Sequence, residues 1–221
     1  NAGFLSYYNN TEQGVNDLFN VYANLTNDSV YTRDLLKVLS EWSIYNTAPL
    51  RSTLETVIQG KVPDSHNTPF TIVGTSNVET EELDIYHFNS LSNEDKVGLL
   101  MSTSAIPVVF PPQHFNGSLY VDGGVISNEI IYQALQFVDC DFYDVVFISA
   151  SSHQEHNVKV DGLFSFLSSI VKLLYHTFNY QLSEFAHNSC NNPKGMLTAC
   201  FPNSSELDKY SILDFNNGSF K

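Results

Sequence analysis

Residues 117–129, GSLYVDGGVISNE, place an aspartate between an alternating apolar stretch and two glycines. The alternation predicts a β-strand that ends near Asp122. Gly123 and Gly124 predict a tight turn, since glycine adopts positive φ without steric cost. A helix is predicted next, over residues 128–137. Asp122 is therefore expected at a strand end, where it serves either as the corner of a turn or as a catalytic base.

Helices and strands alternate along the rest of the chain. The apolar spacing predicts helices over residues 15–25, 28–42, 49–59 and 93–104. Alternating or continuous apolar residues predict strands at 69–75, 83–88, 118–122 and 144–150. A further amphipathic helix is predicted over 161–178, with its apolar stripe packed on a sheet. This order of elements predicts an α/β sandwich.

The composition limits the domain count and the partners. A chain of 221 residues that is 43% hydrophobic is expected to form a single domain around one core. The formal net charge of −14 opposes binding to nucleic acid and to anionic membranes, so any contact with lipid should be apolar. Cys140, Cys190 and Cys200 match neither a disulfide scaffold nor a C-x-x-C zinc site, although Cys190 and Cys200 could pair in an oxidising compartment.

Other groups of polar residues have weaker patterns. His153 and His156 have an H-x-x-H spacing that could touch a metal, but their polar neighbours favour a solvated loop. The acidic residues within 79–84 lack the spacing of a calcium loop and are expected to form a solvated turn. His114 lies close to Asp122 in the sequence but is given no role. The sequence predicts neither a metal nor a cofactor.

The residues that precede Asp122 extend its pattern. Residues 102–112 read STSAIPVVFPP and come before the predicted strand. With the D-G-G turn, they resemble the patatin-like phospholipase family, in which S-x-A-x-P-x-x-F-P-P precedes a strand that ends in D-G-G-x-x-x-N. The matching residues are Ala105, Pro107, Phe110, Pro111, Pro112, Asp122, Gly123, Gly124 and Asn128, and Ser102 lies one residue before the serine position of the pattern. Residues 44–55 and 69–88 also resemble this family, whereas Ile130 replaces a proline that the family often carries.

The resemblance implies a fold and a chemistry. The fold would be a three-layer α/β/α sandwich with a mostly parallel central sheet, in one patatin-like domain over residues 1–221. The chemistry would be hydrolysis of lipid acyl esters by a serine–aspartate dyad without a cofactor, with Asp122 as the general base. A carboxylate is a weak base, so such a dyad needs short geometry and strong oxyanion stabilisation. The residues that would support the site are Pro107, Phe110, Pro111, Pro112 and Asn128.

The serine of such a dyad lies in a G-x-S-x-G elbow between a strand and a helix. Ser76 follows Gly74 in G-x-S spacing, but Val78 replaces the second glycine and another strand follows, so Ser76 is interpreted as a hairpin or loop residue. The first residues, NAGFL, resemble the end of the family's G-x-S-x-G-x-L-N-A segment. The nucleophile and the glycine-rich oxyanion loop are therefore expected before Asn1, in an N-terminally truncated domain that does not hydrolyse esters by itself.

Two alternatives remain open at this point. One is a non-catalytic patatin-like domain that has lost its nucleophile and keeps an apolar groove for lipid. The other is an unrelated α/β binding domain in which Asp122 is only a turn residue. The sequence assigns no compartment, because its N-glycosylation sequons are not decisive evidence of secretion.

Overall fold

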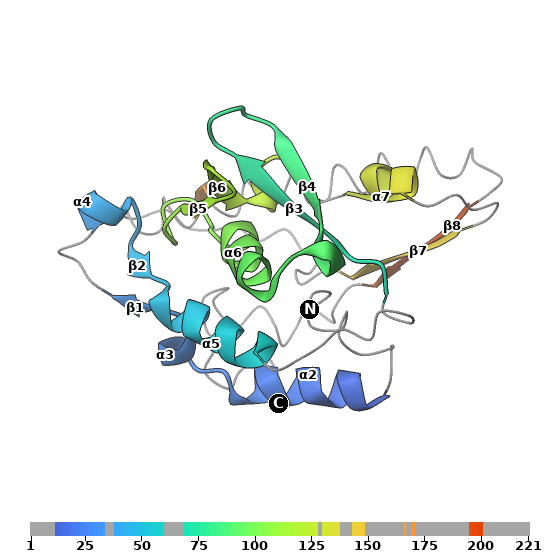
Figure 1. Cartoon of the computed structure of the whole chain (residues 1–221), viewed down its shortest axis with the longest axis horizontal. Helices are drawn as coiled ribbons and strands as arrows, with labels where there is room; N and C mark the ends of the chain where they lie inside the picture. Colours follow the sequence, from blue (N-terminus) through green and yellow to red (C-terminus); the bar gives the residue numbers. More distant parts are fainter. Residues whose placement is uncertain are drawn as a thin grey trace. The chain divides into compact units, whose positions relative to one another are not determined.

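The computed structural model describes residues 12–33, 38–59, 69–127, 130–137, 143–148, 166, 169–170 and 195–200. The chain divides into two compact units, residues 1–126 with 213–221 and residues 127–212. The first unit contains strand β6 (Ser118–Asp122), which is labelled in Figure 1 and ends at Asp122. Whether the two units form one patatin-like domain stays a prediction.

Helices of the first unit agree in part with the predicted ones. They are α2 (Glu12–Asn24), α3 (Asn27–Val30), α4 (Val38–Glu41), α5 (Ala48–Ile58) and α6 (Asn93–Thr103). Helix α5 begins after Thr47 and carries a proline in its first turn, where the missing amide costs nothing. Helix α6 begins after Ser92, whose hydroxyl accepts a hydrogen bond from the amide of Asp95 at 3.1 Å. Each end of α5 and α6 lies within one residue of its predicted position, so both predictions are confirmed.

The predicted continuous helix over 28–42 is wrong. After α3, the backbone becomes extended at Tyr31 and forms strand β1 (Thr32–Arg33), which pairs antiparallel with β2 (Tyr45–Asn46). The rings of Tyr31 and Tyr45 pack with their centroids 4.4 Å apart. This cross-strand contact favours the extended backbone. The helix prediction considered only residues 28–42 and so could not include a contact with Tyr45.

The main sheet has the order β4-β3-β6-β5. Its strands are β3 (Ile72–Asn77), β4 (Leu83–His87), β5 (Gln113–Phe115) and β6 (Ser118–Asp122). All three of its strand pairs are antiparallel, which corrects the expectation of a mostly parallel central sheet. The connections explain this result, because β3–β4 and β5–β6 are joined by short turns and a parallel pair needs a long crossover. The mixed helix-and-sheet class is confirmed.

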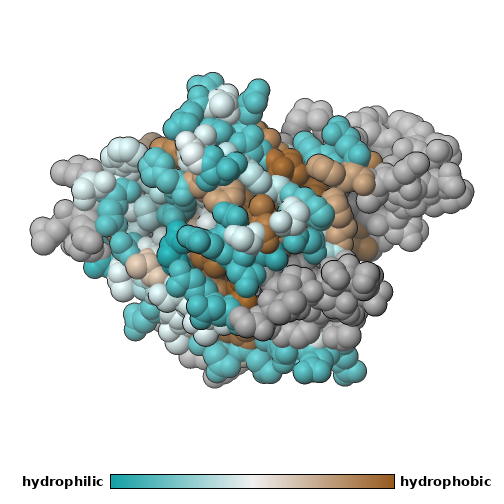
Figure 2. All heavy atoms as spheres, in the orientation of Figure 1, coloured by the Kyte–Doolittle hydropathy of each residue, from teal (hydrophilic) through white to brown (hydrophobic). Residues whose placement is uncertain are grey.

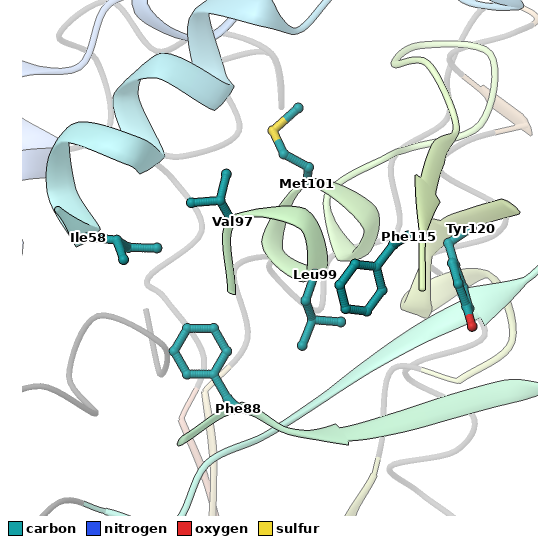
Figure 3. Close-up of a cluster of buried hydrophobic side chains, with 7 residues drawn as sticks. All are labelled: Ile58, Phe88, Val97, Leu99, Met101, Phe115 and Tyr120. Atoms are coloured by element: carbon teal, nitrogen blue, oxygen red, sulfur yellow. The ribbon is translucent and has the colours of Figure 1, made fainter. Parts of the chain in front are cut away.

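The core lies between helix α6 and the sheet (Figure 3). Phe88 and Leu99 are fully buried at its centre. Gly98 allows the Phe115 ring to approach α6, since a Cβ at residue 98 would lie 2.9 Å from Cδ2 of that ring. The buried cluster consists of Ile58, Phe88, Val97, Leu99, Met101, Phe115 and Tyr120. This packing fixes α6, and with it residues 104–112, against the strand that ends in Asp122.

The second unit is described over fewer residues. It contains helix α7 (Ile131–Phe137) and a parallel pair of strands, β7 (Tyr143–Ile148) and β8 (Gly195–Cys200). Phe166 and Ile170, from the predicted amphipathic helix 161–178, are helical but 51% and 40% exposed, contrary to the expected core packing. The remaining side chains of that stripe lie outside the described residues. Among the described residues, no helix is both long and apolar enough to cross a membrane.

Candidate active site at the end of strand β6

Asp122 is the last residue of β6 and the N-cap of a short 3-10 helix, η2 (Gly123–Val125). Its carboxylate Oδ1 accepts a hydrogen bond from the amide of Gly124 at 2.8 Å. Its own amide donates to the carbonyl of Ala105 at 3.0 Å. The side chain is half-buried. Asp122 is thus both a turn residue and an oriented carboxylate, and the two readings of its sequence do not exclude each other.

Gly123 brings the turn into direct contact with strand β3. A Cβ at this residue would lie 2.4 Å from the carbonyl oxygen of Gly74, a distance that real Cβ atoms do not adopt. The same carbonyl oxygen accepts a hydrogen bond from Thr103 Oγ1, at the end of α6, at 2.7 Å. Gly123 is therefore required for this close contact and not for a positive φ, which neither Gly123 nor Gly124 adopts. The contact joins β3, β6 and α6 at one corner, which we call the Asp122 corner.

Two buried hydroxyl groups of strand β3 donate hydrogen bonds to main-chain carbonyls of the Asp122 corner. Thr75 is paired directly with Asp122 and donates to the carbonyl of Val121 at 2.9 Å. Ser76 donates to the carbonyl of Asp122 at 2.9 Å and lies 3.3 Å from that of Gly123. Both side chains are buried. Ser76 lies in strand β3 of the β3–β4 hairpin, in agreement with its interpretation as a hairpin residue, and its hydroxyl donates to main-chain carbonyls, as a structural group does.

Residues 105–112 lie between the end of α6 and strand β5. The carbonyls of Val108 and Val109 accept hydrogen bonds from the amides of Ile44 and Tyr45, at 2.9 and 3.1 Å. Phe110 is buried and packs against the ring of Tyr45, with centroids 6.4 Å apart. These contacts hold the segment that presents the Ala105 carbonyl to Asp122.

The other residues predicted to support the site have separate positions. Pro107, Pro111 and Pro112 are half-buried in the same segment, and Gln113 Nε2 donates to the Pro111 carbonyl at 2.8 Å. Asn128 lies outside the described residues. The structure thus brings Pro107, Phe110, Pro111 and Pro112 into one segment, and their roles in the site stay predictions.

The sequence reading missed a second polar group on the same sheet. Asp84 Oδ2 accepts hydrogen bonds from the Tyr120 hydroxyl at 2.7 Å and from Asn77 Nδ2 at 3.1 Å. Because Tyr120 uses its proton on Asp84, the Tyr86 hydroxyl, 2.8 Å away, must donate to Tyr120. Burial, together with the hydrogen bonds to Asp84 and Tyr86, raises the pKa of the Tyr120 hydroxyl well above its usual 10.0. A pocket of about 440 Å³ opens beside these side chains.

The acidic residues around this group divide into two kinds. Glu79, Glu81 and Glu82 are exposed at the hairpin tip, which is hydrophilic at the top of Figure 2, so the solvated turn is confirmed for them. Asp84 instead belongs to β4, where Thr75 pairs with it on one side and with Asp122 on the other. The sequence did contain a signal for this polar group. The alternation of residues 83–87, LDIYH, places Asp84 and Tyr86 on one face of the strand.

The other predicted groups give no metal site in the described part of the chain. No cluster of three histidine, cysteine or acidic side chains is found there. His114 is exposed on β5, opposite Leu119. Cys200 lies in β8, whereas His153, His156, Cys140 and Cys190 lie outside the described residues.

Comparison with known proteins gives one clear result. The family model described as patatin-like phospholipase matches residues 1–135, more than half of the chain, and this range contains the whole Asp122 corner. A search of curated proteins found no match. The description of the family indicates a hydrolase that acts on lipid acyl esters. The sequence pattern and the matching family model agree, and the chain belongs to the patatin-like phospholipase family.

Proposed function

We propose that the protein is a lipid acyl hydrolase of the phospholipase A or esterase type, in which Asp122 is the general base of a serine–aspartate dyad. The observation that carries this proposal is the geometry of Asp122. Its half-buried carboxylate is oriented by the Gly124 amide at a strand end, inside the segment that the family model matches. General bases are expected on groups that are held rigidly but remain reachable.

The nucleophile of the proposed dyad is a serine in a segment N-terminal to Asn1. Two observations support this part of the proposal. Ser76 is the one serine of the chain with a glycine two residues before it, yet it is buried and donates its proton to main-chain carbonyls. The initial NAGFL also resembles the residues that follow the family's elbow.

The reaction proceeds in two half-reactions. In the first, Asp122 accepts the serine proton while the serine oxygen attacks the ester carbonyl, and the tetrahedral intermediate then releases the alcohol product, which takes up that proton. In the second, Asp122 accepts a proton from water while the water oxygen attacks the acyl-serine. Asp122 then returns this proton to the departing serine oxygen, which releases the fatty acid and regenerates both the serine and the base. Because a carboxylate is a weak base, most of the rate must come from stabilisation of the oxyanion by donors near the elbow.

The test uses the protein extended upstream by roughly 60 residues, a span that can hold a strand, an elbow and a glycine loop. Transcript sequence across the codon for Asn1 defines this extension. Asp122→Asn should lower kcat for a phospholipid or an acyl ester by about 100-fold or more. The amide of asparagine can still accept the Gly124 hydrogen bond, so folding should be unaffected.

Asp84→Asn is the matched control, because Asp84 is paired with the same Thr75 from the opposite side. This variant should keep its kcat. Full activity of Asp122→Asn would refute the proposed base. An upstream segment without a serine, in a protein that binds lipid but does not hydrolyse it, would favour the non-catalytic alternative.

A further inference from the structure

Two large apolar side chains project from the surface near the Asp122 corner. Trp42 is 66% exposed and Val108 is 44% exposed. Ser43, the residue after Trp42, forms a bridge with Val108, so the two exposed residues are neighbours across this bridge. Both also have a positive φ, 56° for Trp42 and 69° for Val108. A positive φ is uncommon for any residue except glycine, and it is a true outlier for a β-branched valine.

The backbone beneath these residues is firmly held. The Val108 carbonyl accepts the amide of Ile44 at 2.9 Å, and the next carbonyl accepts the amide of Tyr45. The rings of Phe110 and Tyr45, which belong to the same two segments, pack against each other. Strain of this kind persists only where surrounding contacts enforce it. The structure therefore maintains two exposed apolar groups in a fixed, unfavourable conformation.

Few ionised side chains lie close to these two residues in the sequence, and Glu41, which precedes Trp42, is half-buried and accepts a hydrogen bond from Asn46 Nδ2 at 2.9 Å. Residues 42–50 and residues 97–121 contain no Asp, Glu, Lys or Arg, in a chain with 24 acidic and 10 basic residues. Both strained residues lie in these two stretches. Such a surface has little attraction for an anionic or cationic partner, and the exposed parts of Trp42 and Val108 can enter a neutral interface with little desolvation of charge. Tryptophan prefers the boundary between water and hydrocarbon, because its ring is apolar and its indole N–H is polar.

We propose that Trp42 and Val108 form a docking surface that inserts into a neutral, zwitterionic lipid surface. The choice of lipid as the partner rests on the proposed function. Val108 lies three residues from Ala105, whose carbonyl binds the Asp122 amide, so docking would bring lipid next to the proposed base. The fixed backbone presents the two side chains without further ordering on binding.

The 221-residue chain contains one tryptophan, so its fluorescence reports this surface alone. Phosphatidylcholine vesicles should shift the Trp42 emission to shorter wavelength, and lipids brominated on the acyl chain should quench it. Both effects should persist in high salt, because the contact is apolar. An emission spectrum that stays unchanged at saturating lipid would overturn the proposal.

Val108→Asn and Val78→Asn form a matched pair of variants. Val78 is 46% exposed at the tip of the β3–β4 hairpin. Val108→Asn should weaken vesicle partitioning about tenfold, the effect of removing one buried apolar side chain. It should not lower the thermal unfolding midpoint, because asparagine tolerates a positive φ. Val78→Asn should leave partitioning unchanged, and an equal effect of both substitutions would contradict the proposal.

This test is separate from that of the hydrolase. Vesicle binding needs no nucleophile, so it is measurable even if the proposed function fails. Conversely, the upstream-extended protein could hydrolyse a dissolved short-chain ester while its Trp42 emission stays unchanged on vesicles. This result would support the proposed hydrolase and overturn the docking surface.

Discussion

Asp84 and Asp122 are paired with the same residue, Thr75, from opposite sides of strand β3, yet they are held in different ways. Asp84 accepts its hydrogen bonds from two side chains, the Tyr120 hydroxyl and the Asn77 amide. Asp122 is oriented by a main-chain amide, and its own backbone is tied to Ala105 and Ser76. The geometry of Asp84 therefore depends on the side chains that bind it. A carboxylate positioned by backbone keeps its geometry even when side chains around it change.

The largest effect is expected where the Asp122 corner depends on close backbone contact. Gly123→Ala should lower the free energy of unfolding by about 3 kcal/mol, since its methyl group would collide with the main chain of Gly74. Urea unfolding of the 221-residue chain measures this loss. Gly117→Ala is the control, because Gly117 has a φ of 86° but open space around its Cβ position. The control substitution should lower the free energy of unfolding by about 1–2 kcal/mol. A larger loss at Gly117 than at Gly123 would contradict the proposed importance of the close contact between Gly123 and Gly74.

An intermediate effect is expected on the Asp84 side. Tyr120→Phe should cost about 2 kcal/mol at neutral pH, because Asp84 loses a hydrogen bond to its charged carboxylate. The raised pKa of Tyr120 also gives a pH signature. Above about pH 10 the unfolded tyrosine releases its proton while the folded one keeps it, so the free energy of unfolding falls as pH rises. Urea unfolding from about pH 9 to 11 should show a shallower decline in the variant than in the natural chain.

Tyr86→Phe provides the comparison for that measurement. It removes a hydroxyl that donates to a neutral oxygen, so its cost should be smaller, about 1 kcal/mol. An alkaline decline that is identical in Tyr120→Phe and the natural chain would show that this hydroxyl does not contribute to it.

The smallest effect is expected at the serine beneath Asp122. Ser76→Ala should cost about 1 kcal/mol of stability, the net value of a buried hydrogen bond, and should leave ester hydrolysis by the upstream-extended protein unchanged. Ser102→Ala, which loses one local hydrogen bond to the Gly98 carbonyl, should cost less. Loss of hydrolysis in Ser76→Ala alone would identify Ser76 as the nucleophile and would overturn the proposed upstream serine.

The strand end and the turn could be predicted because each depends on neighbouring residues, whereas the contact between Gly123 and Gly74 joins distant parts of the chain. Local alternation predicts β6, and adjacent glycines predict a turn. The role of Asp84 could not be predicted in this way, because its partner Tyr120 is 36 residues away. The antiparallel sheet was missed for a related reason, since the alternation of elements does not specify which strands pair.

The strained residues at Trp42 and Val108 also escaped prediction. Neither residue type favours a positive φ, so nothing in the local sequence indicates one. The conformation follows from the bridge between Ser43 and Val108, which joins two distant parts of the chain. The family resemblance gave no pointer either, because Val108 is an unspecified position of the motif in residues 102–112 and Trp42 lies outside the matching residues 44–55.

The two short hairpins of the sheet have a consequence for the order of folding. Asn116 and Gly117 both have positive φ in the turn between β5 and β6, and the β3–β4 turn is similarly local. Such hairpins form within microseconds, whereas contacts that close long loops form late. The hydrogen bond from Ser76 to Asp122 spans 46 residues. We therefore expect the carboxylate to acquire its final surroundings only when the two hairpins join, so that the proposed base is assembled late in folding.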